Sequence, residues 1–236
     1  MKDSNVSSVV PSAQSMANFL ASSVHDMKNS VNMLICGLDK VLASADSAKL
    51  TTYVELVQMN HKAKHINNNL IQLLALYKLG QKIYPFDPQP ICLSDFLHAM
   101  VAQHSELLKS RGINLEVYAQ PGLYWYFDED LISGVVENAL SNAMRYTRCC
   151  IRISAQKKYE KLELRIEDNG DGYPIQVLQE SVDNMRSMDF QGGSTGLGFY
   201  FSAMVARMHH HQEQWGELRL ENGGSLKGAC FVLCLP

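Results

Sequence analysis

Two long seams of apolar residues place the strongest constraint on how this chain can fold. The first seam repeats at alternating spacings of four and three residues and consists of Leu20, Val24, Met27, Val31, Leu34, Leu38 and Val41. After a short polar break at residues 43–49, a second seam consists of Leu56, Met59, Ala63, Ile66, Leu70, Leu73 and Tyr77. This spacing is typical of helices that pack on other helices along one apolar face. The sequence therefore predicts two antiparallel helices within residues 15–82.

A single helical hairpin leaves half of each apolar stripe exposed to water. Pairing with a second copy, which makes a bundle of four helices, is the simplest way to bury both stripes. We therefore expect a homodimer formed through residues 15–82. Residues 1–14 are rich in serine, contain Pro11 and are predicted to form a flexible N-terminal tail.

The pattern changes after the second seam. Three prolines within residues 84–90 (YPFDPQP) end the helix and predict a linker at residues 83–90. Beyond it, helical and alternating patterns mix. We expect helices at 94–110 (with Ser94 as N-cap), 130–146 and 197–210, and strands at 113–118, 151–154, 162–167, 218–221 and 229–235. Residues 91–236 are thus predicted to form an α+β domain in which helices cover a sheet.

Composition excludes some partners and compartments. The formal charge is −3 and the basic residues are scattered, so nucleic acid is not an expected partner. Neither a signal peptide nor an apolar run of roughly 20 residues is present, which predicts a cytoplasmic protein without membrane insertion. The six cysteines lack paired C-x-x-C spacing and are expected to be reduced, mostly buried thiols.

Two segments of the second domain suggest a nucleotide pocket. In EDNGDGYP (167–174), Asp168 follows an apolar strand, where a buried carboxylate needs a donor such as the amino group of adenine. Gly170 and Gly172 would let the backbone approach a flat base closely. In GGSTGLGF (192–199), glycines precede a helix whose first N–H groups can hold phosphates. Either segment alone is weak evidence, since such patterns usually mark ordinary turns.

A third segment, ENALSNAMRYT (137–147), lies on the helix between them. Asn138 and Asn142 are four residues apart and share one face, and an amide oxygen is a suitable ligand for the Mg2+ that accompanies a triphosphate. Arg145 lies nearly one turn further on and can reach a phosphate.

The three segments together resemble the N box and the two glycine boxes of the two-component sensor histidine kinases. The ATP-binding domain of that family has the Bergerat (GHKL) fold shared with gyrase and heat-shock chaperones, and the ending NGGSLKGACFVLCLP is also similar to it. The resemblance spans about residues 15–236 and implies an α/β sandwich at 91–236. It implies the following roles: Mg2+ with ATP on Asn142, with Asn138 beside it; phosphates near Arg145; the base against Tyr146, Asp168, Gly170 and Gly172; and the phosphate chain framed by Thr195, Gly196, Leu197 and Gly198.

The first domain then acquires a role. SVHDMKNSV (23–31) resembles the H box of the same family, which implies that His25 accepts the phosphoryl group. Asp26 would hold a proton on one ring nitrogen so that the other can attack. Asn29, four residues on, would orient water for dephosphorylation of a partner's aspartate. Ser30 stands where the family often has proline, so the resemblance does not imply a helix kink at this position.

The resemblance implies a histidine kinase that phosphorylates His25 from Mg-ATP and passes the phosphoryl group to a receiver domain of a separate response regulator, with phosphatase activity as well. Fewer than 25 residues precede His25, so we expect a separate sensor protein to deliver the signal. Residues 173–191 would form a short lid over ATP, in which Phe190 can stand in for the family's phenylalanine motif.

Three alternatives remain. The first is a phosphotransfer or phosphatase protein of the same shape with little kinase activity. The second is a hydrolytic ATPase of the gyrase or chaperone type, but those carry a carboxylate where this chain has Asn138, and Glu137 is one residue out of register. The third is a noncatalytic helical binding protein, which would leave the glycine segments unexplained. Metal binding at residues 209–211 is not favoured because adjacent residues of a helix point in different directions. His61 and His65 are expected on a solvated helix face.

Overall fold

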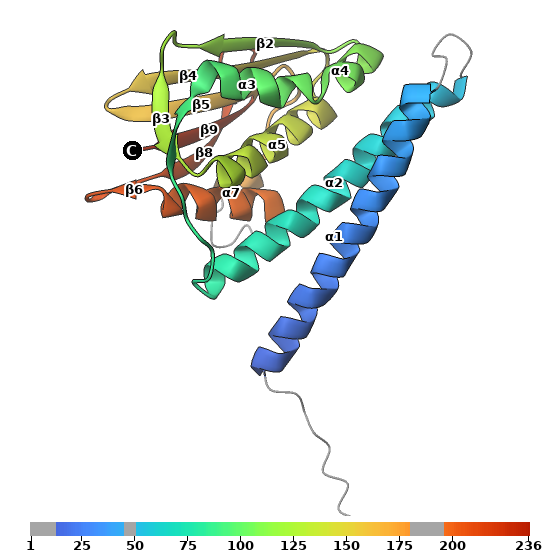
Figure 1. Cartoon of the computed structure of the whole chain (residues 1–236). Coiled ribbons are helices and arrows are strands. Elements are labelled where there is room, and N and C mark those ends of the chain that lie inside the picture. Colours follow the sequence, from blue (N-terminus) through green and yellow to red (C-terminus); the bar gives the residue numbers. More distant parts are fainter. Residues whose placement is uncertain (1–12, 45–50, 180–195) are drawn as a thin grey trace, which may run out of the picture.

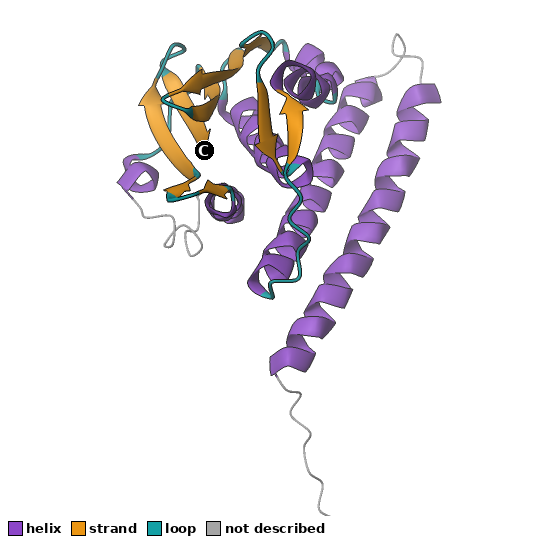
Figure 2. Ribbon diagram, turned by 60° about the vertical axis from the view of Figure 1, so that its left-hand side comes forward, coloured by secondary structure: helices purple, strands orange, loops and turns teal. Residues whose placement is uncertain are grey.

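The computed structural model describes residues 13–44, 51–179 and 196–236, and it consists of two long helices followed by an α+β domain (Figure 1). Helix α1 (Ala13–Ser44) and helix α2 (Thr51–Gly80) lie side by side, with α2 next to the α+β domain (Figures 1 and 2). Asp39 links them, because its Oδ1 accepts a hydrogen bond of 2.7 Å from Asn60 and lies 3.6 Å from Lys64 Nζ. Among the described residues, no helix combines the length and apolarity needed to span a bilayer.

Helix α1 runs without interruption through the segment in which Ser30 replaces proline. The Ser30 hydroxyl donates a 3.0 Å hydrogen bond to the carbonyl of Asp26, one turn earlier. Such a bond competes with the hydrogen bonds of the helix backbone and slightly destabilises the helix, yet α1 continues through it. The helix passes the H-box segment as a continuous α-helix.

The two apolar seams are only half covered by the hairpin. Alternate members remain between 41% and 56% exposed, and they are Met27, Leu34 and Val41 on α1 and Met59, Ile66 and Leu73 on α2. In each helix these three residues are seven positions apart. The intervening members, such as Val31, Leu38 and Ala63, are buried or half-buried. Each helix therefore shows a second, outward apolar stripe at heptad spacing, which we call the outer stripe.

A five-stranded sheet forms the back of the α+β domain. Its strands are β2 (Asn114–Ala119), β4 (Cys150–Lys158), β5 (Lys161–Asp168), β9 (Gly228–Leu235) and β8 (Glu217–Gly223), adjacent in that order. Strands β2 and β4 are parallel, and every other pair is antiparallel. The tight turn between β4 and β5 holds Tyr159 and Glu160 at positive φ of 50° and 62°, as a two-residue hairpin turn requires.

The helices of the domain cover one face of this sheet (Figures 1 and 2). They are α3 (Leu93–Ala102), α4 (Ser105–Arg111), α5 (Glu129–Tyr146), α6 (Ile175–Gln179) and α7 (Leu197–Met208). On β5, Leu162, Leu164 and Ile166 point into the core between sheet and helices. Two small hairpins complete the domain: β1 (Gln89–Cys92) with β3 (Tyr124–Phe127), and β6 (His210–His211) with β7 (Gln214–Trp215). The expected α+β class is confirmed.

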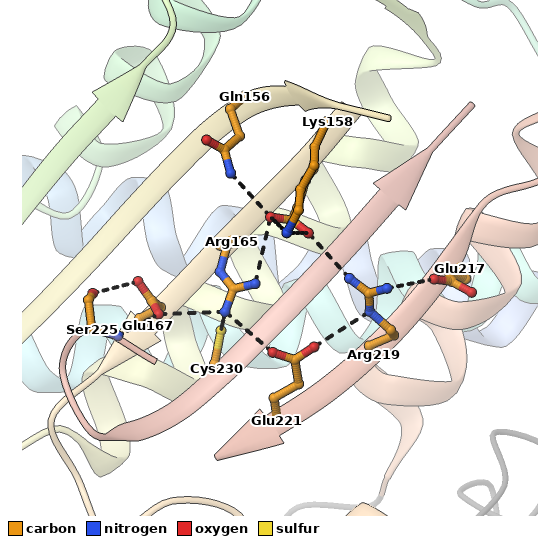
Figure 3. Close-up of polar contacts among 10 residues, drawn as sticks. Gln156, Lys158, Arg165, Glu167, Glu217, Arg219, Glu221, Ser225 and Cys230 are labelled. Carbon is orange, nitrogen blue, oxygen red and sulfur yellow. Dashed lines mark hydrogen bonds and ion pairs between the residues drawn. The ribbon is translucent and has the colours of Figure 1, made fainter. Parts of the chain in front are cut away.

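The other face of the sheet carries a network of ion pairs (Figure 3). Arg165 on β5 lies 3.3 Å from Glu221 and 3.7 Å from Glu167, while Arg219 on β8 lies 3.3 Å from Glu163. Glu163 is only 3% exposed. Burial by itself raises the pKa of Glu163. Hydrogen bonds from Gln156 and Lys158 and nearby positive charges lower this pKa by more than burial raises it, so the pKa lies below its ordinary value. The buried carboxylate is therefore stabilised in its charged form.

Several boundaries differ from the sequence prediction. The helix expected at 94–110 is two helices, α3 and α4, separated at residues 103–104, and Ser94 is not its N-cap because α3 already begins at Leu93. The helix expected at 197–210 ends at Met208, and the following histidines enter a small hairpin. The strand pair β1 and β3 was not predicted, since each strand has only four residues and β1 carries a proline.

His209 is buried and has a structural role. Its Nε2 accepts a 3.1 Å hydrogen bond from the backbone N–H of Asp128, and its Nδ1 lies 2.8 Å from the carbonyl of Val205. Asp128 also caps α5 through Leu131 N and accepts hydrogen bonds from Tyr84 and Asp87. This cluster ties the segment after α2 to the start of α5 and the end of α7.

Helix α2 packs against α4, α5 and α7. A cavity of about 810 Å³ lies along this contact, and its mixed polar and apolar lining includes His61, Gln72, His104 and Glu137. His104 Nε2 lies 2.8 Å from Glu137 Oε2, and the His61 ring lies 6.4 Å from the His104 ring. The expectation that His61 and His65 lie on a solvated face is wrong, because both are half-buried against the α+β domain. Burial, followed by the nearby His104 and Arg111, lowers the pKa of His61 to about 4.

This pKa predicts acid sensitivity of the packing around α2. Between pH about 6.5 and about 4, the unfolded chain binds a proton at His61 that the folded chain does not. The contribution of the neutral His61 to the free energy of unfolding is therefore fully present above the unfolded pKa, and it is lost as the pH drops through this window. His61→Gln should flatten the fall in melting temperature between about pH 7 and about pH 5, measured by calorimetry. The matched control is His98→Gln, at an exposed position on α3. Equal slopes for the wild type and His61→Gln would contradict the assignment.

Candidate functional site

Asp168 is the last residue of β5 and is buried beneath the loop that follows it. Its Oδ1 accepts a 2.7 Å hydrogen bond from Gly170 N and a 3.3 Å bond from Ala229 N on the neighbouring strand β9. Burial raises the pKa of Asp168 above its ordinary value, and the two backbone donors offset part of that rise. The carboxylate is thus fixed in orientation by two backbone groups, within an environment that favours an additional donor.

The loop after Asp168 is built from glycines at points of close approach. A Cβ on Gly170 would collide with the carbonyl oxygen of Tyr146 at the end of α5. Gly172 has a φ of +82°, which side chains other than glycine rarely adopt. Asn222 on β8 holds the far side of the loop, accepting from Tyr173 N at 2.7 Å and donating to Tyr173 O at 2.9 Å. The loop therefore carries no side chains at Gly170 and Gly172, and hydrogen bonds to Asn222 hold its backbone in place.

Asn169 anchors the same loop to the turn that follows α5. Its Oδ1 accepts hydrogen bonds from the Thr147 hydroxyl at 2.8 Å and from the backbone N–H groups of Cys149 and Cys150 at 3.0 Å. The sequence analysis missed this residue. An asparagine followed by glycine after a strand is a known turn signal, because its side chain often bonds to nearby backbone. It would have identified a turn, although not the distant partners.

Helix α5 carries the candidate metal and phosphate ligands. It begins after Asp128, whose carboxylate accepts a 3.0 Å bond from Leu131 N. Asn138 and Asn142 are half-buried and one turn apart on this helix. Asn138 Nδ2 lies 3.4 Å from Ser202 Oγ on α7, and a Cβ on Gly198 would collide with the Asn138 amide. Gly198 thereby allows α7 to pack closely on α5, so both residues have a structural role beside any binding role.

The end of α5 lies next to the loop of Asp168. Arg145 and Tyr146 are exposed, and the Arg145 guanidinium lies 5.4 Å from the centre of the Tyr146 ring. The carbonyl of Tyr146 faces Gly170. Tyr146, Gly170 and Asp168, predicted from two separate segments, therefore meet in space.

The start of α7 completes the site. Gly196 caps the helix with a φ of +66°, and Leu197 is the first helical residue. Tyr173 of the glycine loop packs edge-to-face on Phe199, with ring centres 5.8 Å apart, which brings the loop close to this helix start. Thr195 lies outside the described residues, as does the greater part of the expected lid, Phe190 included. The helix start offers backbone N–H donors of the kind that hold phosphates.

His25 lies on α1 with its side chain 59% exposed. Asn29 Nδ2 lies 3.3 Å and Asp26 Oδ1 3.6 Å from His25 Nδ1. Both neighbours are thus at the same ring nitrogen, on the side away from Nε2. A second pair with the same spacing, His65 and Asn69, has its Nδ1 and Nδ2 atoms 3.5 Å apart, but it is part-buried on α2.

Comparison with known proteins agrees with this architecture. Residues 127–236 match the family model described as "Histidine kinase-, DNA gyrase B-, and HSP90-like ATPase". Sensor protein kinase WalK of Staphylococcus aureus is 26% identical over 146 residues, which are 58% of this chain and 35% of WalK. For the WalK of strain JH9 the aligned share is 24%. The chain therefore spans about a quarter to a third of the length of the curated relatives it matches.

Solved structures share the fold at low identity. Full-length ShkA in complex with AMPPNP is 16% identical with a TM-score of 0.64, covering 93% of this chain and 46% of ShkA. Acinetobacter baumannii histidine kinase AdeS is 16% identical with a TM-score of 0.58, covering 89% of this chain and 96% of AdeS. The catalytic domain of histidine kinase ThkA is 20% identical with a TM-score of 0.54, covering 64% of this chain and 95% of the ThkA domain. The expected fold class, a helical region followed by a GHKL-type ATPase domain, is confirmed.

We predict that Asp168→Asn weakens binding of a nonhydrolysable ATP analogue by about 1–3 kcal/mol, since an amide can present a donor to the adenine amino group where a carboxylate accepts. Calorimetric titration measures this effect. The matched control is Asp171→Asn, three residues along the same loop, where the carboxylate is exposed and paired with Arg148. Unchanged affinity in Asp168→Asn would mean that adenine binds elsewhere.

Proposed function

Because this chain belongs to the two-component sensor histidine kinases and carries their ATPase domain at residues 127–236, we propose that it phosphorylates its own His25 from Mg-ATP. The phosphoryl group then passes to an aspartate in the receiver domain of a response regulator. The observation that carries this proposal is the pairing, in one chain, of a buried and oriented carboxylate at Asp168 with an exposed imidazole at His25.

The proposed nucleotide site uses residues from three elements. Asp168 accepts a hydrogen bond from the adenine amino group, and Gly170 and Gly172 leave room for the base beside Tyr146. The start of α7, from Gly196 to Gly198, donates backbone N–H groups to the phosphates. Asn142 is the proposed ligand of Mg2+, which neutralises phosphate charge when bound, with Asn138 beside it and Arg145 near the phosphates. This assignment is supported by the contacts that join the glycine loop to α5 and α7.

Phosphoryl transfer to His25 requires a free lone pair on one ring nitrogen. Asp26 and Asn29 both lie at Nδ1, which supports Nε2 as the attacking atom. Nε2 forms a bond to the γ-phosphorus as the bond from phosphorus to the β,γ-bridging oxygen breaks, and ADP leaves with that electron pair. The imidazole becomes positively charged, and the carboxylate of Asp26 stabilises this charge before the Nδ1 proton is lost. The Asn29 amide can accept the same Nδ1–H when its oxygen is turned toward the ring.

Asn29 is also the proposed phosphatase residue. Its amide lies one helical turn from His25 on the same exposed face, where it can orient a water toward the phosphoaspartate of a bound regulator. The kinase step and the phosphatase step would then take place at the same surface of α1. In the first step this surface meets the γ-phosphate of ATP, and in the second it meets the phosphoaspartate of the regulator.

A hydrolytic ATPase would need a carboxylate in position to activate water. Glu137, the nearest candidate on α5, is held by His104 at 2.8 Å, and both side chains line the cavity beside α2. The equivalent position for an activating carboxylate carries Asn138, which contacts α7. Both observations favour phosphoryl transfer to a side chain over hydrolysis.

We further propose a homodimer formed through the outer stripe of α1 and α2. The six exposed residues of the stripe recur every seven positions on both helices, which is the pattern that buries itself against a copy of the same hairpin. The second copy would complete a four-helix bundle and cover apolar side chains that a single hairpin leaves in water.

The phosphoacceptor is tested by substitution. His25→Gln should abolish uptake of acid-labile, base-stable phosphate from γ-labelled ATP, while leaving binding of the ATP analogue unchanged. His65→Gln is the matched control, because it removes the second histidine that has an asparagine one turn later. Label retained by His25→Gln and lost from His65→Gln would move the acceptor to α2 and refute the H-box assignment.

The two roles at the H box should separate in a second experiment. Asn29→Ala should keep autophosphorylation within about twofold of the wild type, because the amide touches neither nucleotide nor phosphorus in the transfer. Asp26 remains at His25 Nδ1 in this variant and still holds its proton. The same variant should slow dephosphorylation of a phosphorylated receiver domain by at least about tenfold. Loss of both activities together would assign Asn29 to transfer instead.

The dimer is tested through the outer stripe. Leu34→Glu removes apolar burial worth about 1.5–3 kcal/mol in each copy, so the dissociation constant should rise by a factor on the order of a hundred or more. Light scattering over a concentration series measures this change. Met33→Glu is the matched control, because Met33 is exposed but lies outside the stripe. A monomeric mass for the unmodified chain at micromolar concentration would contradict the four-helix bundle.

A further inference from the structure

Two adjacent cysteines lie at the edge of the proposed nucleotide site. Cys149 is exposed and Cys150 is half-buried at the first position of β4. The expectation of mostly buried thiols is wrong, because only Cys230 and Cys234 are buried. The sulfur atoms of Cys149 and Cys150 are 3.4 Å apart. Side chains of successive residues in a regular strand point to opposite faces of the sheet. The turn at residues 147–150 instead brings the two sulfurs into contact.

The turn that positions these thiols is held by the loop of Asp168. Asn169 Oδ1 accepts hydrogen bonds from Cys149 N and Cys150 N, both at 3.0 Å, and Asn169 Nδ2 donates to Cys149 Sγ at 3.3 Å. Asn169 directly follows Asp168, and the turn directly follows Tyr146. The sulfur of Cys149 is therefore one hydrogen bond away from the backbone that orients the candidate adenine ligand.

The two thiols also differ in chemical character. The hydrogen bond from Asn169, followed by the one from Cys150, lowers the pKa of Cys149. The thiol of Cys149 raises the pKa of Cys150 in turn. An exposed sulfur with a lowered pKa, in contact with a sulfur whose pKa is raised, is the arrangement of an attacking and a resolving cysteine.

We propose that Cys149 and Cys150 form an oxidation site for peroxides, closing a disulfide between adjacent residues that loosens the loop of Asp168. The Cys149 thiolate attacks a peroxide oxygen: an S–O bond forms, the O–O bond breaks, and the departing oxygen leaves as hydroxide, which takes a proton to become water. The Cys150 thiol then attacks the Cys149 sulfur, the S–S bond forms, and the hydroxyl leaves with the Cys150 proton as a second water. Two thiols are oxidised by two electrons, and hydrogen peroxide is reduced to two waters.

Closing the bond must disturb the turn. An S–S bond of about 2.05 Å requires the sulfurs to approach from 3.4 Å, which draws Cys149 Sγ away from Asn169 Nδ2. Adjacent Cα atoms lie about 3.8 Å apart, below the usual separation for disulfides, so the ring is strained. Strained, exposed disulfides are the readily reduced ones, which makes the oxidation reversible by small thiols. The N–H groups of residues 149 and 150 shift with the ring and no longer hold Asn169 in place.

Effects on the loop and on nucleotide binding are separate consequences. Loosening of residues 167–173 follows from the contacts of Asn169 alone. The loss of ATP affinity rests on the proposed function, because it requires that Asp168 bind adenine.

The experiment uses the full chain with the substitution Cys36→Ser, which removes an exposed thiol on α1. This protein is treated with hydrogen peroxide, and catalase then removes the remaining peroxide. Peptide mapping should show a loss of two hydrogen atoms confined to the peptide with residues 149–150, reversed by dithiothreitol. Amide hydrogen exchange of residues 167–173 should become faster by about tenfold or more in the oxidised form, since local opening sets that rate. Cys149→Ser and Cys150→Ser should each fold, show unchanged exchange when reduced, and fail to respond to peroxide with faster exchange.

Several results would overturn the proposal: sulfinic acid without a disulfide, a bridge between two chains, or a disulfide with unchanged exchange of residues 167–173. Binding of a nonhydrolysable ATP analogue is measured in parallel. A reduced chain that does not bind the analogue would refute the proposed nucleotide site, while the mass and exchange data would still decide whether the oxidation site exists. If the reduced chain binds, oxidation should weaken the affinity by about tenfold.

Discussion

The loop that follows β5 in the α+β domain depends on the buried carboxylate of Asp168. A charged group at the end of an apolar strand must find donors, and here they are backbone N–H groups of Gly170 and Ala229. That requirement forces the chain to turn back tightly after β5, which only glycine at position 170 permits beside the carbonyl of Tyr146. Asn169 and Asn222 then tie the loop to the turn between α5 and β4 and to β8. The loop is thus held by the hydrogen bonds of the Asp168 carboxylate together with those of Asn169 and Asn222.

Much of this arrangement could be read from the sequence because the relevant signals are local. The apolar seams, the prolines after residue 83 and the helix over 130–146 depend on spacing within a single segment, and spacing is visible in a sequence. The resemblance of three short segments to a known family supplied what spacing does not, namely that Asp168, Asn142 and Gly198 belong to one site. The roles of these residues remain predictions, although Tyr146, Gly170 and Asp168 do lie together.

What the sequence analysis missed depends on contacts between segments distant in the chain. His61 and His65 have no acidic neighbours in sequence. Helix α2 nevertheless packs them against the α+β domain, where His61 lies near His104 and Glu137, two residues that are 33 positions apart in the chain. His209 looked like part of a histidine run and is instead a buried support for Asp128, 81 residues earlier. Asn169 looked like a turn residue and holds a second turn about 20 residues away. Side-chain burial and long-range partners of this kind leave no periodic trace in a sequence.

Strand β8 forms one edge of the sheet, and its charges have a consequence for how copies of the chain can meet. Glu217, Arg219 and Glu221 alternate along this edge, and each already has an ion-pair partner within its own sheet. A foreign strand docking here would have to desolvate these charges and break those pairs, which disfavours edge-to-edge growth of the sheet into aggregates. The charges of β8 thus make this edge of the sheet a poor template for the addition of strands from other copies.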